Sequence, residues 1–425
     1  MMSLAVVSIA ALVLSVVLSF TTAINVGVIA MTLAWLIGVY LGGMSVDVVL
    51  QGFPTALLVT LIGITLLFSL AECNGTLARL TARLVRLCRG HAGLLPVMFF
   101  LLGFVISTIG PGATPTSALL APAAMAAAGR AGIRPLLMAI MAGNGALAGT
   151  LSPFAPTGIV AHGVMASIGL GGVEWQTFAY NALAHALVGI GGFVLLGGWR
   201  LFRRPAGDST VSEPALDDMQ TAHWLTVAGI AALIVGVAGF GMHVGLTALG
   251  IAAGLTLLGA VEEKKAIQAM PWGVILMVTG VTVLIAMMEK TKGMELFTSG
   301  LASIAGPWTL APIVAFGTGL ISVYSSTSGV VLPAFLPMVP GLSTGVGGID
   351  PLPIDQAMGS GSMPIAWSMN IGASLVDLSS LSTVGALFLA AAPPGTDVRA
   401  MFNGLLLWGL SMTVVGAALC WVLFR

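Results

Sequence analysis

Long apolar segments alternate with short polar turns along most of the chain. A segment of about 20 mostly apolar residues can cross a bilayer as a helix. We expect such helices near residues 3–20, 24–42, 54–72, 132–150, 178–200, 223–241, 244–260, 272–289, 357–377 and 401–424. The first segment has neither a basic stretch nor a small-residue cleavage motif, which predicts a retained helix rather than a signal peptide.

Two further apolar segments, residues 94–127 and 307–340, are too long for one crossing and carry polar interruptions, "STIGPGATPTS" and "SVYSSTS". Lipid cannot satisfy freed backbone N–H and C=O groups, so such an interruption must be buried in protein or line a water-filled cavity. Both segments are therefore predicted to be helical hairpins that enter the membrane and return. Two more interruptions, "LSPFAPTG" at 151–158 and "LSSLSTVG" at 378–385, predict spanning helices that are unwound part-way.

The composition indicates a membrane protein. Hydrophobic residues make up 58% of the chain and charged residues 7%, with a mean hydropathy of +1.07, whereas soluble domains carry about 25% charged residues. The formal net charge is zero, which argues against a nucleic-acid partner. Cys73, Cys88 and Cys420 are scattered, so neither a disulfide framework nor a metal site is expected. We expect an all-α polytopic protein of the inner (plasma) membrane.

A polar connection at residues 200–223 separates two similar halves, in which three motifs recur in the same order. The motifs are G-x-T-x6-E from Gly63 and from Gly280, Thr-Ser followed by a proline from Thr116 and from Thr327, and G-A-x4-L-S-x5-G from Gly145 and from Gly372. The expected organisation is a first repeat (1–200, with scaffold helices in 1–90 and a hairpin and broken helix in 91–200), a cytoplasmic linker (201–222) and a second repeat (223–425, with scaffold helices in 223–305 and a hairpin and broken helix in 306–425).

The distribution of basic residues predicts how the halves are oriented. With five full spans per half, the second half enters the membrane from the opposite side, so the repeats are expected to be inverted. Placing the helix near Arg79 and Arg83 in the cytoplasm puts twelve of the fifteen basic residues inside and only Lys290, Lys292 and Arg425 outside. Inverted repeats with paired broken helices are typical of secondary transporters, whose site lies near the membrane midplane.

The interruptions supply the chemistry of such a site. A hairpin tip or an unwound helix exposes N–H groups at helix N-termini, which attract anions, and C=O groups at C-termini, which attract cations. Thr and Ser hydroxyls donate to a carboxylate and also present oxygen to a hard ion such as Na⁺. The alternative is that the Ser, Thr and Gly residues are simply small residues that allow close helix packing in lipid.

Two stretches of the first half carry a family resemblance. "GFPTALLVTLIGITLLFSLAECNGTLARL" (52–80) and "GNGALAGTLSPFAPTGIVAHG" (143–163) resemble the MatC-type dicarboxylate (malonate) carriers, and the layout is more distantly similar to divalent-anion:sodium symporters. The resemblance implies cation-coupled uptake of a small dicarboxylate, a homodimer, and elevator-type motion of the domain that holds the hairpins. The symporters carry Ser-Asn-Thr at each hairpin tip, but here neither 112–114 nor 324–326 keeps the asparagine. The coupling ion, Na⁺ or H⁺, is therefore left open.

These motifs define the candidate site. The candidate substrate-binding residues are Thr116, Ser117, Thr327, Ser328, Thr157, Thr383, Asn144 and Asn370. The candidate cation ligands are Thr114, Ser152, Gly145, Ser325, Ser326, Ser379, Gly372 and Asp377. No cofactor or resident metal is expected beyond the transported ion.

Several candidates have a structural interpretation as well. An ionisable residue at membrane depth is costly and usually functional, so Asp377 either serves the cation or a proton, or caps the broken helix. Asn144 and Asn370 either orient the broken helices or contact substrate. Glu72 and Glu289 are interpreted as interfacial, and His162 and His185 as packing or hydrogen-bonded histidines.

Three other functions compete with a self-sufficient carrier. The nearest is the large membrane subunit of a tripartite carboxylate transporter, which needs a small membrane partner and an extracytoplasmic binding protein. A membrane enzyme is disfavoured because the chain has no H-E-x-x-H or G-x-S-x-G motif. A channel is disfavoured because paired hairpins that meet at the midplane favour alternating access.

Overall fold

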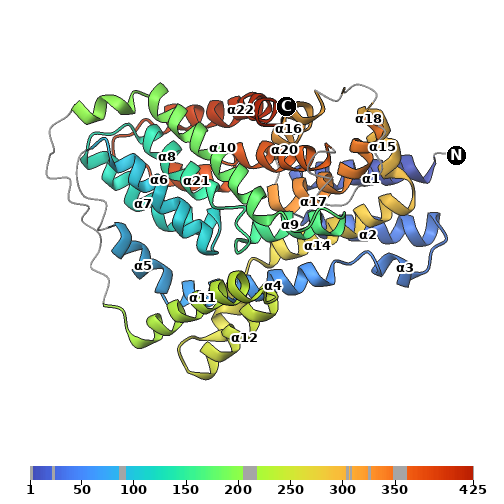
Figure 1. The fold of residues 1–425 in the computed structure, drawn as a ribbon, viewed down its shortest axis with the longest axis horizontal. Helices are drawn as coiled ribbons and strands as arrows, with labels where there is room; N and C mark the ends of the chain where they lie inside the picture. Colours follow the sequence, from blue (N-terminus) through green and yellow to red (C-terminus); the bar gives the residue numbers. More distant parts are fainter. Residues whose placement is uncertain are drawn as a thin grey trace.

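The structure, a computed structural model, describes residues 3–21, 24–85, 92–203, 218–302, 306, 309–323, 327–347 and 361–424, and every regular element in these residues is helical (Figure 1). The first half contains α1 (Leu4–Thr21), α2 (Val26–Trp35), η1 (Leu36–Leu41), α3 (Val46–Leu50), α4 (Thr55–Cys73), α5 (Thr76–Val85), α6 (Leu95–Ile109), α7 (Ala113–Arg130), α8 (Pro135–Ala148), α9 (Pro156–Ser167), α10 (Glu174–Leu195) and η2 (Gly198–Arg203). The second half contains α11 (Thr221–Phe240), α12 (Val244–Leu257), α13 (Glu263–Ala269), α14 (Trp272–Lys290), α15 (Gly293–Ala302), α16 (Leu310–Ser322), η3 (Thr327–Val331), α17 (Leu332–Phe335), η4 (Leu336–Met338), α18 (Val339–Gly347), α20 (Ser362–Leu375), α21 (Thr383–Ala390) and α22 (Val398–Leu423).

The order of elements repeats between the halves. In each half, two apolar helices, a short helix, a long helix and another short helix precede a hairpin, a helix interrupted near its middle and a final long helix. Thus α4 and α14 hold the same place in their halves, as do α10 and α22. This order follows the three recurring sequence motifs, while the inversion of the two halves stays a prediction.

The interruptions lie where the apolar pattern predicts them. The first hairpin turns between α6 and α7; in the second, α16 ends at Ser322 and η3 begins at Thr327, and the predicted tip at 324–326 lies outside the described residues. The helices predicted at 132–150 and 357–377 prove shorter, because α8 and α20 have 14 residues each. At 1.5 Å per residue each is about 21 Å long, too short for a hydrocarbon core of about 30 Å. Each therefore needs its continuation, α9 or α21, to complete a crossing.

Helices of one half pack against helices of the other at two close crossings. α4 packs against α12, and α14 packs against α2. A Cβ atom on Gly63 would lie 2.1 Å from the carbonyl oxygen of Gly245, and one on Gly280 would lie 2.0 Å from the carbonyl oxygen of Gly27. The shared G-x-T motif therefore begins with the glycine that allows each crossing. The Asn25 amide strengthens the second crossing by donating to the Gly273 carbonyl at 2.7 Å.

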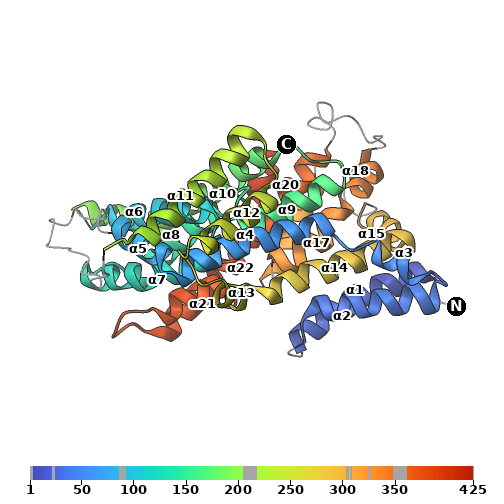
Figure 2. The ribbon, with the colours of Figure 1, turned by 90° about the horizontal axis from the view of Figure 1, so that it is seen from below.

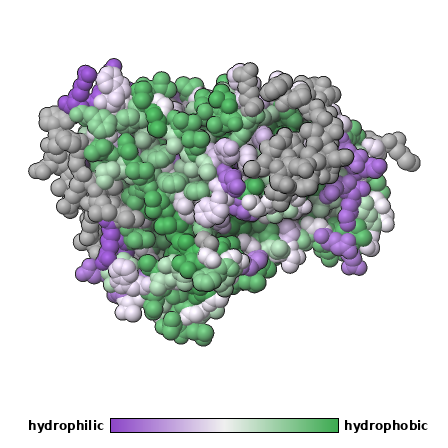
Figure 3. All heavy atoms as spheres, viewed as in Figure 1, coloured by the Kyte–Doolittle hydropathy of each residue, from purple (hydrophilic) through white to green (hydrophobic). Residues whose placement is uncertain are grey.

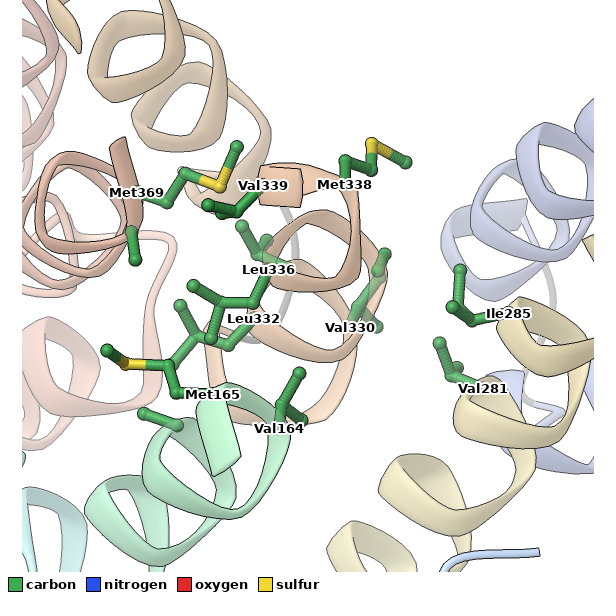
Figure 4. Packing of buried hydrophobic residues seen from close by; sticks show 14 of the residues in the cluster. Val164, Met165, Val281, Ile285, Val330, Leu332, Leu336, Met338, Val339 and Met369 are labelled. Carbon is green, nitrogen blue, oxygen red and sulfur yellow. The ribbon is translucent and has the colours of Figure 1, made fainter. Parts of the chain in front are cut away.

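The hairpins and broken helices form a second group of packed elements. α6 packs on α8, α16 packs on α20 and α22, and α10 lies between α8 and α20 (Figures 1 and 2). The continuation of the second hairpin belongs to a large apolar cluster, in which Val330 is directed toward Val281 and Ile285 of α14 and Leu332 lies on the side of Met165 in α9 (Figure 4). This hairpin is therefore packed tightly against its neighbours.

The outer surface suits a bilayer. Apolar side chains cover much of the face seen in Figure 3, and Leu195, Phe240 and Leu257 are 82%, 78% and 88% exposed. Among the described helices, α4, α10, α14 and α22 are long and apolar enough to cross a membrane, and further apolar helices of 10–17 residues accompany them. Burial of this surface in lipid removes its cost of hydration.

Candidate functional site

A cavity of about 640 Å³ lies where the interruptions meet. Its wall includes the tip of the first hairpin, the breaks after α8 and α20, the start of η3, one face of α4, and parts of α5 and the α13–α14 junction. The two halves of the chain therefore share one internal space. Its lining residues are Thr65, Phe68, Ser69, Glu72, Leu77, Pro111, Gly112, Ala113, Thr114, Pro115, Leu147, Thr150, Pro156, Thr157, Ala269, Pro271, Val274, Val323, Thr327, Ser328, Asp377, Leu381, Ser382, Thr383 and Val384.

Two glycines allow the first hairpin to turn at the cavity. Gly110 (φ 151°) and Gly112 (φ 79°) flank Pro111 in backbone conformations that L side chains rarely adopt. A Cβ atom on Gly110 would also lie 2.0 Å from the ring of Phe68 on α4, so the tip approaches this helix closely. The chain can then enter α7 at Ala113 without leaving the cavity wall.

Three helix N-termini reach the cavity. α7, α9 and α21 begin within the lining, and Thr114, Thr157 and Thr383 lie in their first turns. The residues before α7 and α9, Gly112 and Ala155, provide no side-chain cap. In α9, Pro156 has no N–H and the Gly158 N–H donates to the Thr150 carbonyl at 3.1 Å, so the Thr157 N–H is the remaining first-turn donor. Uncapped first-turn N–H groups and the positive end of the helix dipole both favour a negative ligand.

A hydroxyl and carboxylate cluster lies on the side of the second half. The Thr327 hydroxyl donates to the Asp377 carboxylate at 2.6 Å, and it also makes a short hydrogen bond with the Ser322 hydroxyl. The Ser382 hydroxyl donates to the Asp377 backbone carbonyl and accepts from Gly385 N–H at 3.2 Å, thereby capping α21. The alternative interpretation of Asp377 as the helix cap is therefore wrong, since Ser382 performs that role.

The corresponding hydroxyls of the first half have no such partner. Ser107 and Thr108 lie at the end of α6, and Thr116 and Ser117 lie near the start of α7; the four hydroxyl oxygens are buried and have no hydrogen-bond partner among the described residues. Burying an unpartnered hydroxyl costs free energy, so native structures seldom do so without a reason. The two hairpins therefore differ in one respect: the Thr327 hydroxyl of the second hairpin bonds to a carboxylate, whereas these four hydroxyls of the first hairpin have no partner among the described residues.

The charge of the cavity wall is negative. Among the described lining residues, Glu72 and Asp377 are the charged ones, and none is Lys, Arg or His. The described residues also hold no group of three or more His, Cys, Asp or Glu that could bind a metal ion. An anion in this cavity would have to be held by hydroxyls and helix N-termini, and two carboxylates would oppose it.

The sequence-predicted residues divide into two groups. Thr114, Thr157, Thr327, Ser328, Thr383 and Asp377 line the cavity. Thr116, Ser117, Asn144, Gly145, Ser152, Asn370, Gly372 and Ser379 are buried outside the lining. Ser325 and Ser326 lie outside the described residues.

The buried group has identifiable structural neighbours. A Cβ atom on Gly145 would lie 2.1 Å from the Phe100 carbonyl oxygen, and one on Gly372 would lie 2.2 Å from that of Ala315, so both glycines lie at close helix crossings. The Ser152 hydroxyl donates to the Thr108 carbonyl at 2.7 Å and thereby holds the first break against the first hairpin. Asn144 and Asn370 donate to carbonyls one turn earlier in their own helices, and the Ser379 hydroxyl accepts from Leu381 N–H. The Thr116 and Ser117 hydroxyls, as described above, have no partner among the described residues.

Sequence reasoning missed part of the wall. Thr65, Phe68 and Ser69 are not among the candidate site residues, and Glu72 is interpreted as interfacial, although all four residues line the cavity from α4. The usable signal is the recurring G-x-T-x6-E motif, which contains Thr65 and Glu72. Asn181 was missed too, although it touches both broken helices.

The comparisons with known proteins agree with this architecture. Residues 2–150 match the family model of the dicarboxylate carrier protein MatC N-terminus. No curated protein sequence matches the chain. Among solved structures, the fold is similar to that of the YdaH transporter of Alcanivorax borkumensis, with a TM-score of 0.57 and 16% sequence identity; the match covers 88% of this chain and 87% of that one. Residues 2–150 are thus similar to the N-terminal part of the MatC dicarboxylate carriers, and the fold of the chain is similar to that of a transporter.

Proposed function

We propose that the protein is a secondary carrier of the inner membrane that takes up a small dicarboxylate, such as malonate or a C4-dicarboxylate, together with Na⁺ or H⁺. The observation that carries this proposal is a cavity lined by three helix N-termini from both halves and by the Asp377–Thr327 pair, with no basic side chain among the described lining residues. No cofactor and no nucleic-acid partner are part of the proposal.

The N-termini favour a substrate with two separated carboxylates. α7 and α9 belong to one half and α21 to the other, so one carboxylate can be bound by each half of the wall. An anionic group at a helix N-terminus gains about 0.3–1 kcal/mol, and up to about 2 kcal/mol when partly buried. The Thr114, Thr157 and Thr383 hydroxyls would add hydrogen bonds. A substrate with one carboxylate would leave one side of the wall without a partner.

A co-transported cation would remove the repulsion from the acidic wall. Asp377, held by the Thr327 hydroxyl, would accept a proton or bind Na⁺ through its carboxylate. The buried Ser107, Thr116 and Ser117 hydroxyls would supply oxygen ligands to an ion at the first hairpin. Binding of the cation and of the anion would then each favour the other, which is the basis of coupled transport.

The contacts are also consistent with an elevator. The crossed helices α2, α4, α12 and α14 would form the fixed scaffold of a homodimer, and the group built from α6–α10 and α16–α22 would carry the site. Part of the cavity wall comes from α5 and the α13–α14 junction, segments that carry Arg79, Arg83, Lys264 and Lys265. By the positive-inside rule this side faces the cytoplasm, so the conformation would be inward-facing.

The test is uptake by the purified protein alone in liposomes. Radiolabelled malonate and succinate are offered with an inward Na⁺ gradient and, separately, with a proton gradient of equal size. We expect gradient-driven uptake under one of them, and its loss in the Asp377→Asn variant, which keeps the shape of the side chain. Absence of uptake under both gradients in folded protein would refute the proposal and favour the subunit of a tripartite transporter or another substrate class.

A further inference from the structure

A row of polar side chains on α10 joins the two broken helices. Thr177, Asn181 and His185 follow one another at intervals of four residues, which places them on one face of the helix. All three are buried, with exposed fractions of 1%, 0% and 0%. Buried polar groups in a membrane protein usually hydrogen-bond to neighbouring helices, so this row is expected to hold specific partners.

The three residues bind different partners. The Thr177 hydroxyl accepts from the Trp367 indole N–H of α20 at 3.0 Å, well before that helix ends. His185 pairs through Nδ1 with the Asn144 side chain of α8 at 3.0 Å. Asn181, between them, is the member that bonds to both broken helices.

Asn181 lies where both broken helices end. Its Nδ2 donates to the carbonyls of Leu147 and Ala148, at 3.0 and 3.2 Å, in the last turn of α8. Its Oδ1 accepts from the Ser374 hydroxyl, at 2.7 Å, in the last turn of α20. The orientation of the amide is determined by its partners, because the two carbonyls can only accept.

The two helix ends lead directly into the cavity wall. Leu147 and Thr150 line the cavity at the end of α8, and Asp377 lines it three residues after Ser374. Asn181 does not line the cavity itself, but one of its partners, Leu147, does. Asn181 determines how far apart the two breaks can lie, since it bonds to the backbone of one and to a side chain of the other.

We infer that Asn181 is a positioning residue for the substrate site, holding the two breaks in one fixed relation so that both halves of the site contact the same ligand. The inference rests on the proposed function for its ligand, but not for its geometry. Loss of the link would leave each half of the site folded while their spacing fluctuates. Substrate affinity would therefore decrease more than the maximal rate, because a ligand with two carboxylates needs both halves at once.

The test compares two single bonds made by the same helix. Ser374→Ala removes the bond between Asn181 and α20 and leaves the bonds to α8. Thr177→Val removes a buried bond between α10 and α20 two turns away from the break, and it serves as the matched control. Asn181→Asp, which keeps the acceptor for Ser374 and loses the donor to α8, is a second variant should it fold.

Two measurements are made on each variant. In liposomes we expect Ser374→Ala to raise the KM for the dicarboxylate about tenfold with a maximal rate within about twofold of the parent, and Thr177→Val to change neither. In detergent we expect hydrogen exchange to accelerate at residues 149–155 and 376–382 in Ser374→Ala only. An equal rise in KM or in exchange for Thr177→Val, or none for Ser374→Ala, would overturn the inference.

The uptake and hydrogen-exchange measurements distinguish a failure of the proposed function from a failure of the positioning role. If the parent protein takes up no dicarboxylate, the proposed function fails, and hydrogen exchange still decides whether Asn181 holds the two breaks together. If the parent transports but Ser374→Ala keeps the parental KM and the parental exchange, the positioning role fails and the proposed function stands.

Discussion

The two hairpin threonines provide a stringent test of the site, because they occupy equivalent places in the motif order and differ in their partners. Thr327 donates to Asp377 and bonds to Ser322, whereas the Thr116 hydroxyl is buried without a partner among the described residues. Replacing each threonine by valine removes the hydroxyl with little change in shape. The structure predicts opposite effects on stability and the same effect on transport.

The magnitudes follow from the partners. Thr327→Val removes a hydrogen bond to a carboxylate, worth about 1.5–3 kcal/mol. Thr116→Val removes a buried hydroxyl that has no partner among the described residues, so the variant should be more stable by about 1 kcal/mol. For a chain of 425 residues, 1 kcal/mol corresponds to roughly 1 °C in Tm. We therefore expect Tm to fall by about 2–3 °C for Thr327→Val and to rise by about 1 °C for Thr116→Val.

The assay is thermal unfolding in detergent at increasing Na⁺ concentration, with uptake measured in parallel. If the hydroxyls of the first hairpin bind the ion, the parent protein gains about 2.7 kcal/mol at a concentration one hundred times the Kd. Thr116→Val should lose this gain, and both variants should lose most of their gradient-driven uptake. The reasoning is refuted if Thr116→Val is as destabilising as Thr327→Val, or if it transports normally.

Two further predictions concern packing. Gly280→Val would place its Cβ atom 2.0 Å from the Gly27 carbonyl oxygen of α2, so we expect thermal unfolding to show a loss of at least about 3 kcal/mol of stability. Gly250→Ala places its Cβ atom where no heavy atom lies within 4 Å, and it should stabilise the protein by about 0.5–1 kcal/mol. A less stable Gly250→Ala than Gly280→Val would contradict the close crossing of α14 and α2. Ser152→Ala loses its 2.7 Å bond to the Thr108 carbonyl at the end of α6, so it should lower Tm in thermal unfolding and raise KM in the uptake assay. Ser380→Ala is the control: the Ser380 hydroxyl has no partner among the described residues, so this variant should neither lower Tm nor raise KM.

Much of the fold can be predicted from the apolar pattern, because a long apolar segment with Gly, Pro and Ser in its middle cannot remain one helix in lipid. The positions of both hairpins and of both broken helices follow from this rule. The exact helix ends do not. Thr116 and Ser117 lie inside the first turns of α7 rather than at an open tip, because Gly110 and Gly112 complete the turn earlier.

The site can be predicted only in part. Glycines of a repeated motif look alike in the sequence whether they expose a carbonyl to an ion or admit a neighbouring helix. Gly145 and Gly372 illustrate this, since the carbonyl oxygens that approach them belong to α6 and α16, on other parts of the chain. The role of Asn181 could not be predicted either, because its partners lie on α8 and α20 and no residue near it in the sequence indicates them.

The crossings between the two halves also determine when a helix can find its partner during synthesis of the chain. Asn25 at the start of α2 finds its partner Gly273 at the start of α14 only after 248 more residues have been made. At about 5–20 residues per second this takes roughly 12–50 s, during which α2 lacks its partner α14. The speed of translation therefore determines how long each new chain is open to misassembly and to quality-control proteases.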